Sequence, residues 1–245
     1  AALAAYGGKL YAGLGDDSGE GDVSVCDPVR TGAPGVCESG DWSVAYDSSA
    51  YAATALVEFS GRLYAGYGSY NNAAGDIMAY DGTSWVPSYD GSYDIVHALA
   101  VYGGRLFAAM GDDAGDGDIL VCDPKATGLP ALCEAGDWSV SHDGATASIE
   151  SLTAFNGMLF AGVGGAAAGQ GDLLVFDGVS WKRAYDGTST RLPALAAFSG
   201  RLYAATAASE IQRLTPAVSS ITYSAADGST GLETLSAVIP SRLTS

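Results

Sequence analysis

The chain has 245 residues, enough for one large domain or two small ones, and a net charge of −17 with only 11 Lys and Arg residues. Such an acidic surface repels phosphate backbones and anionic membranes. Nucleic acid is therefore not expected as a partner. No apolar run approaches the roughly 18 residues that a membrane span needs. Because the chain opens inside a folded pattern, LAAYGGKLYAG, we expect a mature or trimmed product.

A ten-residue phrase recurs along the chain and predicts a repeat protein. Its pattern is L-x-x-[YF]-x-G-x-L-[YF]-A, and its copies start at Leu3, Leu56, Leu99, Leu152 and Leu195. The intervals alternate between 53 and 43 residues, which indicates that a two-repeat unit of 96 residues was itself duplicated.

The first four repeats continue in the same way after the phrase. A Gly-rich loop leads to a Gly-Asp pair, at Asp22, Asp76, Asp118 and Asp172. A short apolar strand and a tryptophan strand follow, the latter at Trp42, Trp85, Trp138 and Trp181. That strand ends in Tyr-Asp-Gly or a near variant, at Asp47, Asp90, Asp143 and Asp186. Four short strands in about 45 residues, without helical periodicity, predict an all-β fold, a β-propeller of about five four-stranded blades.

One repeat carries a resemblance to a known family. GRLYAGYG followed by DIMAYDGTSW resembles a kelch-type blade, with its glycine turn, aromatic strand, Tyr-Asp pair and following Trp. The resemblance covers residues 3–191 well and 195–234 weakly. It implies blade architecture but no particular activity, because propellers host enzymes, lectins and passive scaffolds alike.

The end of the chain predicts a partial extra repeat. We place a propeller over 1–234, with a short fifth repeat that lacks the tryptophan, and an orphan strand pair over 235–245. LSAVIPSRL aligns with LAAFSGRLY, and Pro240 and Ser241 stand in for the turn. Such a pair continues into further chain, packs on this molecule or adds to a neighbouring subunit. The candidate inter-subunit residues are Leu235, Val238, Ile239 and Leu243.

Four cysteines lie in the extra length of the long repeats, each pair 11 residues apart. They are Cys26, Cys37, Cys122 and Cys133. A cysteine pair at the base of a hairpin-like excursion predicts a disulfide, hence an extracellular, secreted or cell-surface protein. Zinc is the alternative, against which the absent C-x₂₋₄-C spacing argues.

Two acidic loops, GDDSGEGD and GDDAGDGD, are candidate calcium sites. Their carboxylates alternate with glycines, an arrangement that suits Ca²⁺: Asp16, Asp17, Glu20, Asp22, Asp112, Asp113, Asp116 and Asp118. Asp22 and Asp118 have equivalents in every repeat, so we expect them to be turn or strand-entry hydrogen bonders. A solvated acidic turn is the alternative for the other acids, and no other cofactor is expected.

Other candidate chemistry is sparse. His142 takes the place of a tyrosine in the sister repeats, and His97 falls just before a first strand. No nucleophile elbow, P-loop or His-Glu-x-x-His motif occurs, so no enzyme is expected. We expect the tryptophans to pack between blades. Tyr70, Asn71 and Asn72, in a loop unlike its sisters, are candidate sugar contacts.

These observations favour a non-enzymatic, secreted β-propeller that acts as an extracellular structural or adhesive component. In its sharpest form the hypothesis is a filament subunit joined through its C-terminal strands, with self-association as the expected interaction. The alternative hypothesis is a lectin-like propeller that binds extracellular glycans.

Overall fold

The computed structural model divides into two compact units, Ala1–Leu152 and Thr153–Ser245, and each is described by itself. Side chains are described as far as residue 213. The described residues are 2–15, 21–28, 35–48, 52–68, 75–91, 95–111, 117–124, 132–144, 148–165, 170–224 and 230–242.

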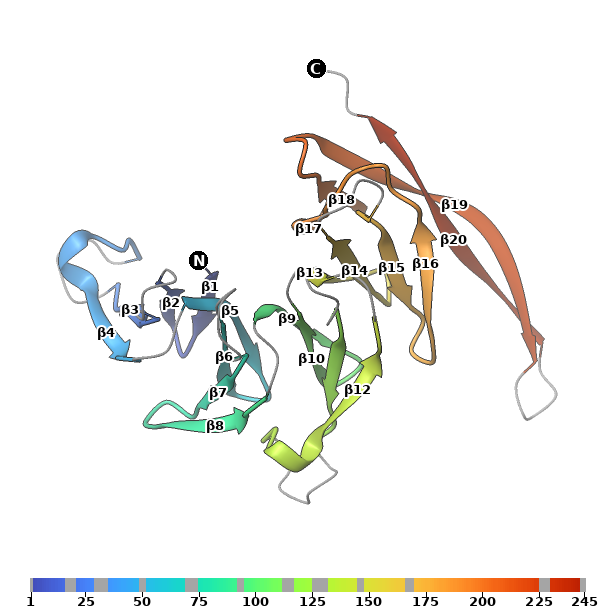
Figure 1. Cartoon of the computed structure of the whole chain (residues 1–245). Coiled ribbons are helices and arrows are strands. Elements are labelled where there is room, and N and C mark those ends of the chain that lie inside the picture. The colour runs from blue at the N-terminus through green and yellow to red at the C-terminus, as the bar shows by residue number, and fades with distance from the viewer. Residues whose placement is uncertain are drawn as a thin grey trace. The chain divides into compact units, whose positions relative to one another are not determined.

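Five four-stranded antiparallel sheets follow one another along the chain, each built from strands in sequence order (Figure 1). Sheet 1 contains β1 (Ala2–Tyr6), β2 (Lys9–Gly13), β3 (Val23–Cys26) and β4 (Trp42–Tyr46). Sheet 2 contains β5 (Ala52–Phe59), β6 (Arg62–Gly68), β7 (Ile77–Tyr80) and β8 (Trp85–Tyr89). Sheet 3 contains β9 (Val96–Tyr102), β10 (Arg105–Met110), β11 (Ile119–Cys122) and β12 (Trp138–His142). Sheet 4 contains β13 (Ser148–Phe155), β14 (Met158–Gly164), β15 (Leu173–Phe176) and β16 (Trp181–Tyr185). Sheet 5 contains β17 (Ala194–Phe198), β18 (Arg201–Ala205), β19 (Ile211–Ser224) and β20 (Thr230–Arg242). The predicted all-β class with about five four-stranded blades is confirmed.

The glycine of the repeat phrase forms the hairpin turn between the first two strands of each sheet. In sheet 2 the turn residues Ser60 and Gly61 have φ of 51° and 73°, and Phe59 pairs with Arg62. Positive φ at both central residues defines a type I′ turn, whose twist matches the flanking strands. Asn156 and Gly157 repeat this conformation in sheet 4, with φ of 48° and 73°. The second turn residue is a glycine throughout because it has no Cβ to oppose positive φ.

The two faces of each sheet have different compositions. The two aromatic residues of the phrase lie on one side, which we call the aromatic face, and its two leucines lie on the other, the leucine face. Side-chain alternation along paired strands produces this separation. The aromatic pair is in edge or tilted contact in four sheets, with centroid distances of 6.0 Å for Tyr6–Tyr11, 6.1 Å for Phe59–Tyr64, 6.1 Å for Tyr102–Phe107 and 6.3 Å for Phe155–Phe160.

Neighbouring sheets within a unit pack aromatic face against leucine face. Tyr11 on sheet 1 lies in one cluster with Leu63 and Ala65 of sheet 2. Tyr64, on the opposite face of sheet 2, lies in one cluster with Leu106 of sheet 3. In the second unit, Phe160, Leu173 and Phe155 of sheet 4 pack with Leu202, Ala204 and Leu195 of sheet 5. The core therefore lies between successive sheets.

Trp85 and Trp138 contribute to these contacts, as predicted for packing between blades. The ring of Trp85 stacks on Tyr80 at 4.9 Å and meets Tyr46 of the preceding sheet at 5.2 Å. Trp138 meets Tyr89 of the preceding sheet at 5.8 Å.

Both predicted disulfides are present, Cys26–Cys37 and Cys122–Cys133, with Cα–Cα distances of 6.0 and 5.9 Å. After each pair a three-residue 3-10 turn precedes the tryptophan strand: η1 (Ser39–Asp41) and η2 (Ala135–Asp137). Within the described ranges, no helix is long and apolar enough to cross a membrane.

The C-terminal segment differs from the prediction. Residues 230–242 form one strand, β20, which pairs with β19 from Ser224↔Thr230 to Gln212↔Arg242 (Figure 1). The turn expected at Pro240 and Ser241 is wrong, because Pro240 pairs with Leu214 inside the ladder. Sister turns need positive φ, whereas a proline ring fixes φ near −65°, a value that an edge strand accepts.

A polar network ties the second disulfide to sheet 2. The buried hydroxyl of Ser88 donates to the carbonyl of Cys133 at 2.5 Å and accepts from Trp138 Nε1 at 3.3 Å. The hydroxyl of Tyr64 accepts from the Cys133 N–H at 3.1 Å. The excursion of sheet 3 is therefore fixed to the neighbouring sheet by three hydrogen bonds.

We predict that Ser88→Ala lowers the free energy of unfolding by about 1–3 kcal/mol, because it leaves the buried Cys133 carbonyl and the partly buried Trp138 indole N–H without this partner. Chemical denaturation of the oxidised protein measures the effect. Ser43, exposed on β4, provides the matched control, and Ser43→Ala should stay within about 0.5 kcal/mol of wild type. Equal effects of the two variants would contradict the network's role.

We also predict that a thiol reductant opens Cys26–Cys37 before Cys122–Cys133. Cys122 and Cys133 are both fully buried, whereas Cys37 is half-buried, and exchange requires access of the attacking thiolate. Alkylation at increasing reductant concentration, followed by peptide mapping, gives the order. Simultaneous opening of the two bonds would contradict this prediction.

Candidate functional site

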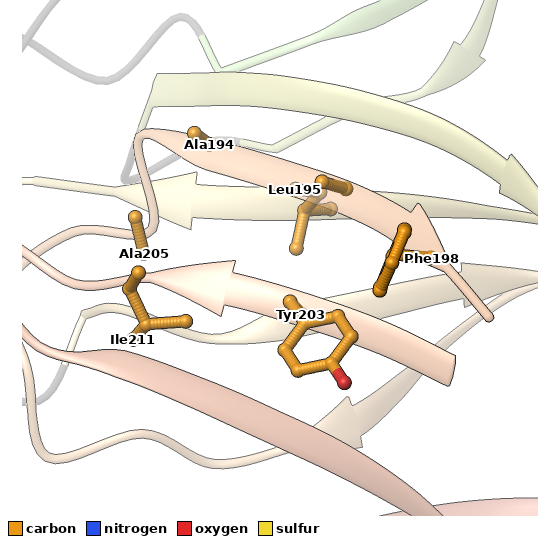
Figure 2. A pocket seen from close by; sticks show the side chains of 7 residues that line it. Ala194, Leu195, Phe198, Tyr203, Ala205 and Ile211 are labelled. Atoms are coloured by element: carbon orange, nitrogen blue, oxygen red, sulfur yellow. The ribbon is translucent and has the colours of Figure 1, made fainter. Parts of the chain in front are cut away.

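An apolar groove of about 470 Å³ lies on the aromatic face of sheet 5 (Figure 2). It is lined by Ala194, Leu195, Ala196, Phe198, Tyr203, Ala205 and Ile211. β17 and β18 supply all but one of these residues, and Ile211 at the start of β19 closes one side. The hydroxyl of Tyr203 is the polar group among the lining side chains, so the groove suits an apolar surface and offers little to a charged or heavily hydroxylated ligand.

The groove is the exposed counterpart of a face that is buried in the sister sheets. The strand register equates Ile211 with Val23 of sheet 1, Ile77 of sheet 2 and Leu173 of sheet 4. Those three residues are 0% exposed, whereas Ile211 is 59% exposed and Phe198 is 69% exposed. In sheets 1, 2 and 4 the following sheet of the same unit covers this face. No sheet follows sheet 5 among the described residues.

A cation without its usual acid lies on the same face. Lys9, Arg62 and Arg105 open the second strand of sheets 1 to 3, and each is paired with the aspartate that follows the third strand, at 3.1, 3.9 and 4.0 Å. Arg201 opens the second strand of sheet 5, but the register places Thr215 where the aspartate would be. Arg201 is exposed and forms no ion pair in the described part of the chain. It alternates with Leu202, so it shares a face with Tyr203.

The repeated aspartates belong to the fold, as the sequence predicts. Oδ1 of Asp22 accepts the N–H of Ser48 at 3.2 Å, and Oδ1 of Asp118 accepts that of Gly144 at 3.0 Å. Asp172 makes the equivalent bond to Gly187 at 3.1 Å. Each aspartate thus joins the entry of the third strand to the turn after the fourth.

The calcium hypothesis stays a prediction, because its other residues lie outside the described ranges: Asp16, Asp17, Glu20, Asp112, Asp113 and Asp116. Among described residues, no group of three or more His, Cys, Asp or Glu side chains is placed to hold a metal. The candidate sugar contacts Tyr70, Asn71 and Asn72 also lie outside the described ranges.

The inter-subunit candidates Leu235, Val238 and Ile239 lie on β20, and Leu243 lies outside the described ranges. None of the candidate residues whose side chains are described is among those that line the sheet 5 groove. In sequence the fifth repeat differs from its sisters, with EIQRL in place of the usual apolar strand and no tryptophan after it, but this difference does not indicate a groove.

The two histidines occupy different settings. His142 ends β12, and burial lowers its pKa below the ordinary value, although the carboxylates of Asp118 and Asp143 act in the opposite direction. His97, on β9, takes the place of Thr54 and Glu150 in sister repeats. Thr54 donates its hydroxyl to the Val96 carbonyl at 2.5 Å, and the buried Glu150 accepts from Ser148 at 3.1 Å. Those two polar side chains make contacts within the fold.

No family model matches the sequence, and no curated protein matches it. Solved structures do share its fold. A chain of the nidogen–laminin complex is 13% identical, aligns over 84% of this chain and 73% of its own, and has a TM-score of 0.57. A prolyl endopeptidase is 13% identical and has a TM-score of 0.51; the alignment covers 95% of this chain but 35% of that one. Together with the five sheets, this likeness shows a β-propeller of roughly five blades. The kelch-type resemblance stays a prediction.

We predict that His142→Tyr, which restores the residue of the sister repeats, reduces the loss of stability in mild acid. A histidine whose folded-state pKa is depressed binds its proton more readily when unfolded, so stability falls as the pH drops below about 6.5. Tyrosine does not titrate in this range. Thermal midpoints at pH 8 and pH 5 measure the difference, and an equal fall in variant and wild type would contradict the prediction.

Proposed function

We propose that the protein is a non-enzymatic, extracellular β-propeller that acts as a structural or adhesive component and joins its partners through apolar contact. The observation that carries the proposal is the uncovered aromatic face of sheet 5. A groove of about 470 Å³ with an almost entirely apolar lining resembles a protein-docking surface more than a catalytic cleft. Exposing Phe198 and Ile211 to water is unfavourable unless a partner covers them.

The disulfides support an extracellular location. Both cysteine pairs are closed, and structural disulfides persist mainly in oxidising compartments. They stabilise the two long excursions, because a disulfide lowers the conformational entropy of the unfolded chain.

The positions of the acids support a structural role over catalysis. Catalytic sites need perturbed carboxylates or histidines gathered in a cleft. Here Asp22, Asp118 and Asp172 occupy equivalent positions and bind backbone N–H groups. A carboxylate that makes the same hydrogen bond in successive repeats stabilises the repeat. A catalytic site would be expected to have a set of side chains in one repeat that the other repeats lack.

The edge of sheet 5 adds a second means of association. β20, which has 13 residues, is the last strand in the described order of sheet 5. No further described strand pairs along its outer edge. An edge of this length can add a strand from a neighbouring molecule. The filament hypothesis therefore keeps Leu235, Val238 and Ile239 at a subunit junction, now as part of a blade.

Electron microscopy and pelleting of the oxidised, purified protein over a wide concentration range test the proposal. We expect ordered assemblies to form above a threshold concentration. Above that threshold, the concentration of single particles left in the supernatant should stay constant. Single particles at every concentration, together with selective retention on a glycan array, would contradict the proposal and favour the glycan-binding alternative.

A further inference from the structure

We propose that Tyr6 and Tyr80 are an oxidative modification site, at which a peroxidase and hydrogen peroxide join the two phenol rings as dityrosine. The new bond links sheet 1 to sheet 2 within one molecule, and both sheets belong to the first unit. The proposal goes beyond the proposed function, from which it takes only the oxidising, extracellular location. It is supported by the contact between the phenols, their departure from the repeat and their access to solvent.

Three tyrosines from two sheets meet at the interface of sheets 1 and 2. We call Tyr6, Tyr11 and Tyr80 the tyrosine cluster. The ring centroids lie 6.0 Å apart for Tyr6–Tyr11, 6.1 Å for Tyr6–Tyr80 and 6.2 Å for Tyr11–Tyr80. The rings of Tyr6 and Tyr80 meet edge to face at 65°, an arrangement typical of aromatic side chains in direct contact. Two radicals formed on these rings are therefore already neighbours, and rotation of the side chains is enough to bring their ortho carbons together.

The tyrosine cluster is not a general feature of the repeat. The strand register gives Tyr80 three counterparts in sheets 1, 3 and 4, which are Cys26, Cys122 and Phe176. Sheets 2, 4 and 5 have a phenylalanine where sheet 1 has Tyr6, namely Phe59, Phe155 and Phe198. Phenylalanine satisfies the packing at these positions in the sister sheets, so packing alone does not require the phenol hydroxyls of the cluster.

Two members of the cluster lie at the rim of the interface, and the third lies behind them. Tyr6 and Tyr80 are half-buried, whereas Tyr11 is 5% exposed. The hydroxyl of Tyr6 donates to the carbonyl of Gly61 at 3.0 Å, in the exposed hairpin turn of sheet 2. An oxidant in solution therefore reaches Tyr6 and Tyr80, while Tyr11 is shielded.

The phenol of Tyr6 is neutral at physiological pH. Burial raises the pKa of Tyr6 above its ordinary value, and the carboxylate of Asp81 acts in the same direction, whereas Arg62 opposes them. Burial also raises the pKa of Tyr11, to which its hydrogen bond with Tyr80 contributes. Oxidation of Tyr6 thus removes a proton together with the electron, and the solvent-exposed rim gives that proton a way out.

One molecule of hydrogen peroxide balances the reaction. The peroxidase takes one electron and one proton from each phenol, and the peroxide accepts both electrons and both protons and leaves as two molecules of water. The two phenoxyl radicals then combine, and a carbon–carbon bond forms between the ring carbons ortho to the hydroxyls. The hydrogens on those two carbons move to the phenol oxygens, which restores both hydroxyls.

The link supplies a connection that the disulfides do not. Cys26–Cys37 and Cys122–Cys133 each lie within one repeat, so neither joins two sheets. A bond between Tyr6 and Tyr80 closes a loop between residues far apart in the sequence and lowers the conformational entropy of the unfolded chain, as a disulfide does. We therefore expect the linked protein to have a higher thermal midpoint than the unlinked protein.

Treatment of the purified, disulfide-intact protein with a haem peroxidase and hydrogen peroxide tests the proposal. We expect dityrosine fluorescence, loss of two hydrogen atoms from the intact mass of the monomer, and a peptide in which tandem mass spectrometry joins Tyr6 to Tyr80. Tyr6→Phe and Tyr80→Phe should each remove at least nine-tenths of this product. Tyr102→Phe is the matched control, because Tyr102 is the half-buried counterpart of Tyr6 in sheet 3 and packs against Phe107.

Thermal midpoints of the untreated variants establish that each is folded, and phenylalanine already occupies equivalent positions in sister sheets. Several outcomes would overturn the proposal: a wild type without the link, a link through Tyr11 in place of Tyr6, or equal yields in Tyr6→Phe and Tyr102→Phe. Oxidation of Trp85, which stacks on Tyr80 at 4.9 Å, in place of the link would do the same.

The cross-link and the proposed function fail separately. The link forms within a monomer, so its yield is measured below the concentration at which assemblies appear under the microscope. A linked protein that never assembles supports the modification site and contradicts the proposed structural role. A protein that assembles but gives no link contradicts the modification site alone.

Discussion

The contact between an aromatic face and a leucine face is the interaction on which the rest of this structure depends. A sheet of four short strands cannot bury both of its faces alone, so each blade needs a neighbour on either side. Sheet 2 shows the completed arrangement: Leu63 on one face and Tyr64 on the other are both fully buried. Where this cover is absent, as on the aromatic face of sheet 5, the same kind of apolar surface is exposed, and Phe198 is 69% exposed. The location of the exposed apolar surface thus follows from the repeat itself.

The same constraint determines where polar chemistry can lie. Between sheets, a polar group is tolerated only when its hydrogen bonds are satisfied, as Ser88 shows by bridging Trp138 and the Cys133 carbonyl. At the loop ends, Asp22 and its sisters bind backbone N–H groups that would otherwise be unpaired. These side chains make their hydrogen bonds within the fold. The exposed aromatic face of sheet 5 is therefore the feature that distinguishes this sheet from its sisters.

Much of the fold could be predicted from the sequence, because its signals are local and repeated. Glycine after a small turn residue predicts a type I′ hairpin, and cysteines 11 residues apart at the base of an excursion predict a disulfide; both are present. The C-terminal strand was not predicted, because similarity of apolar spacing outweighed the backbone requirement at Pro240. The groove could not be predicted either. Ile211 matches buried residues in sequence, and its exposure depends on whether another sheet follows, which is a property of the array and not of the residue.

Exposed apolar surface on an acidic chain brings two opposing forces to association. Covering Phe198, Tyr203 and Ile211 favours contact by the same transfer of apolar area from water that holds sister sheets together. A net charge of −17 on each copy opposes it, and physiological salt screens that repulsion beyond about 8 Å. In the association proposed above, the short-range apolar term acts where apolar faces meet, while the charge disfavours contact between the other surfaces. Arg201 reduces the local repulsion at the aromatic face of sheet 5. Under the proposed function, these two terms together would favour association through the aromatic face of sheet 5 over association through other surfaces.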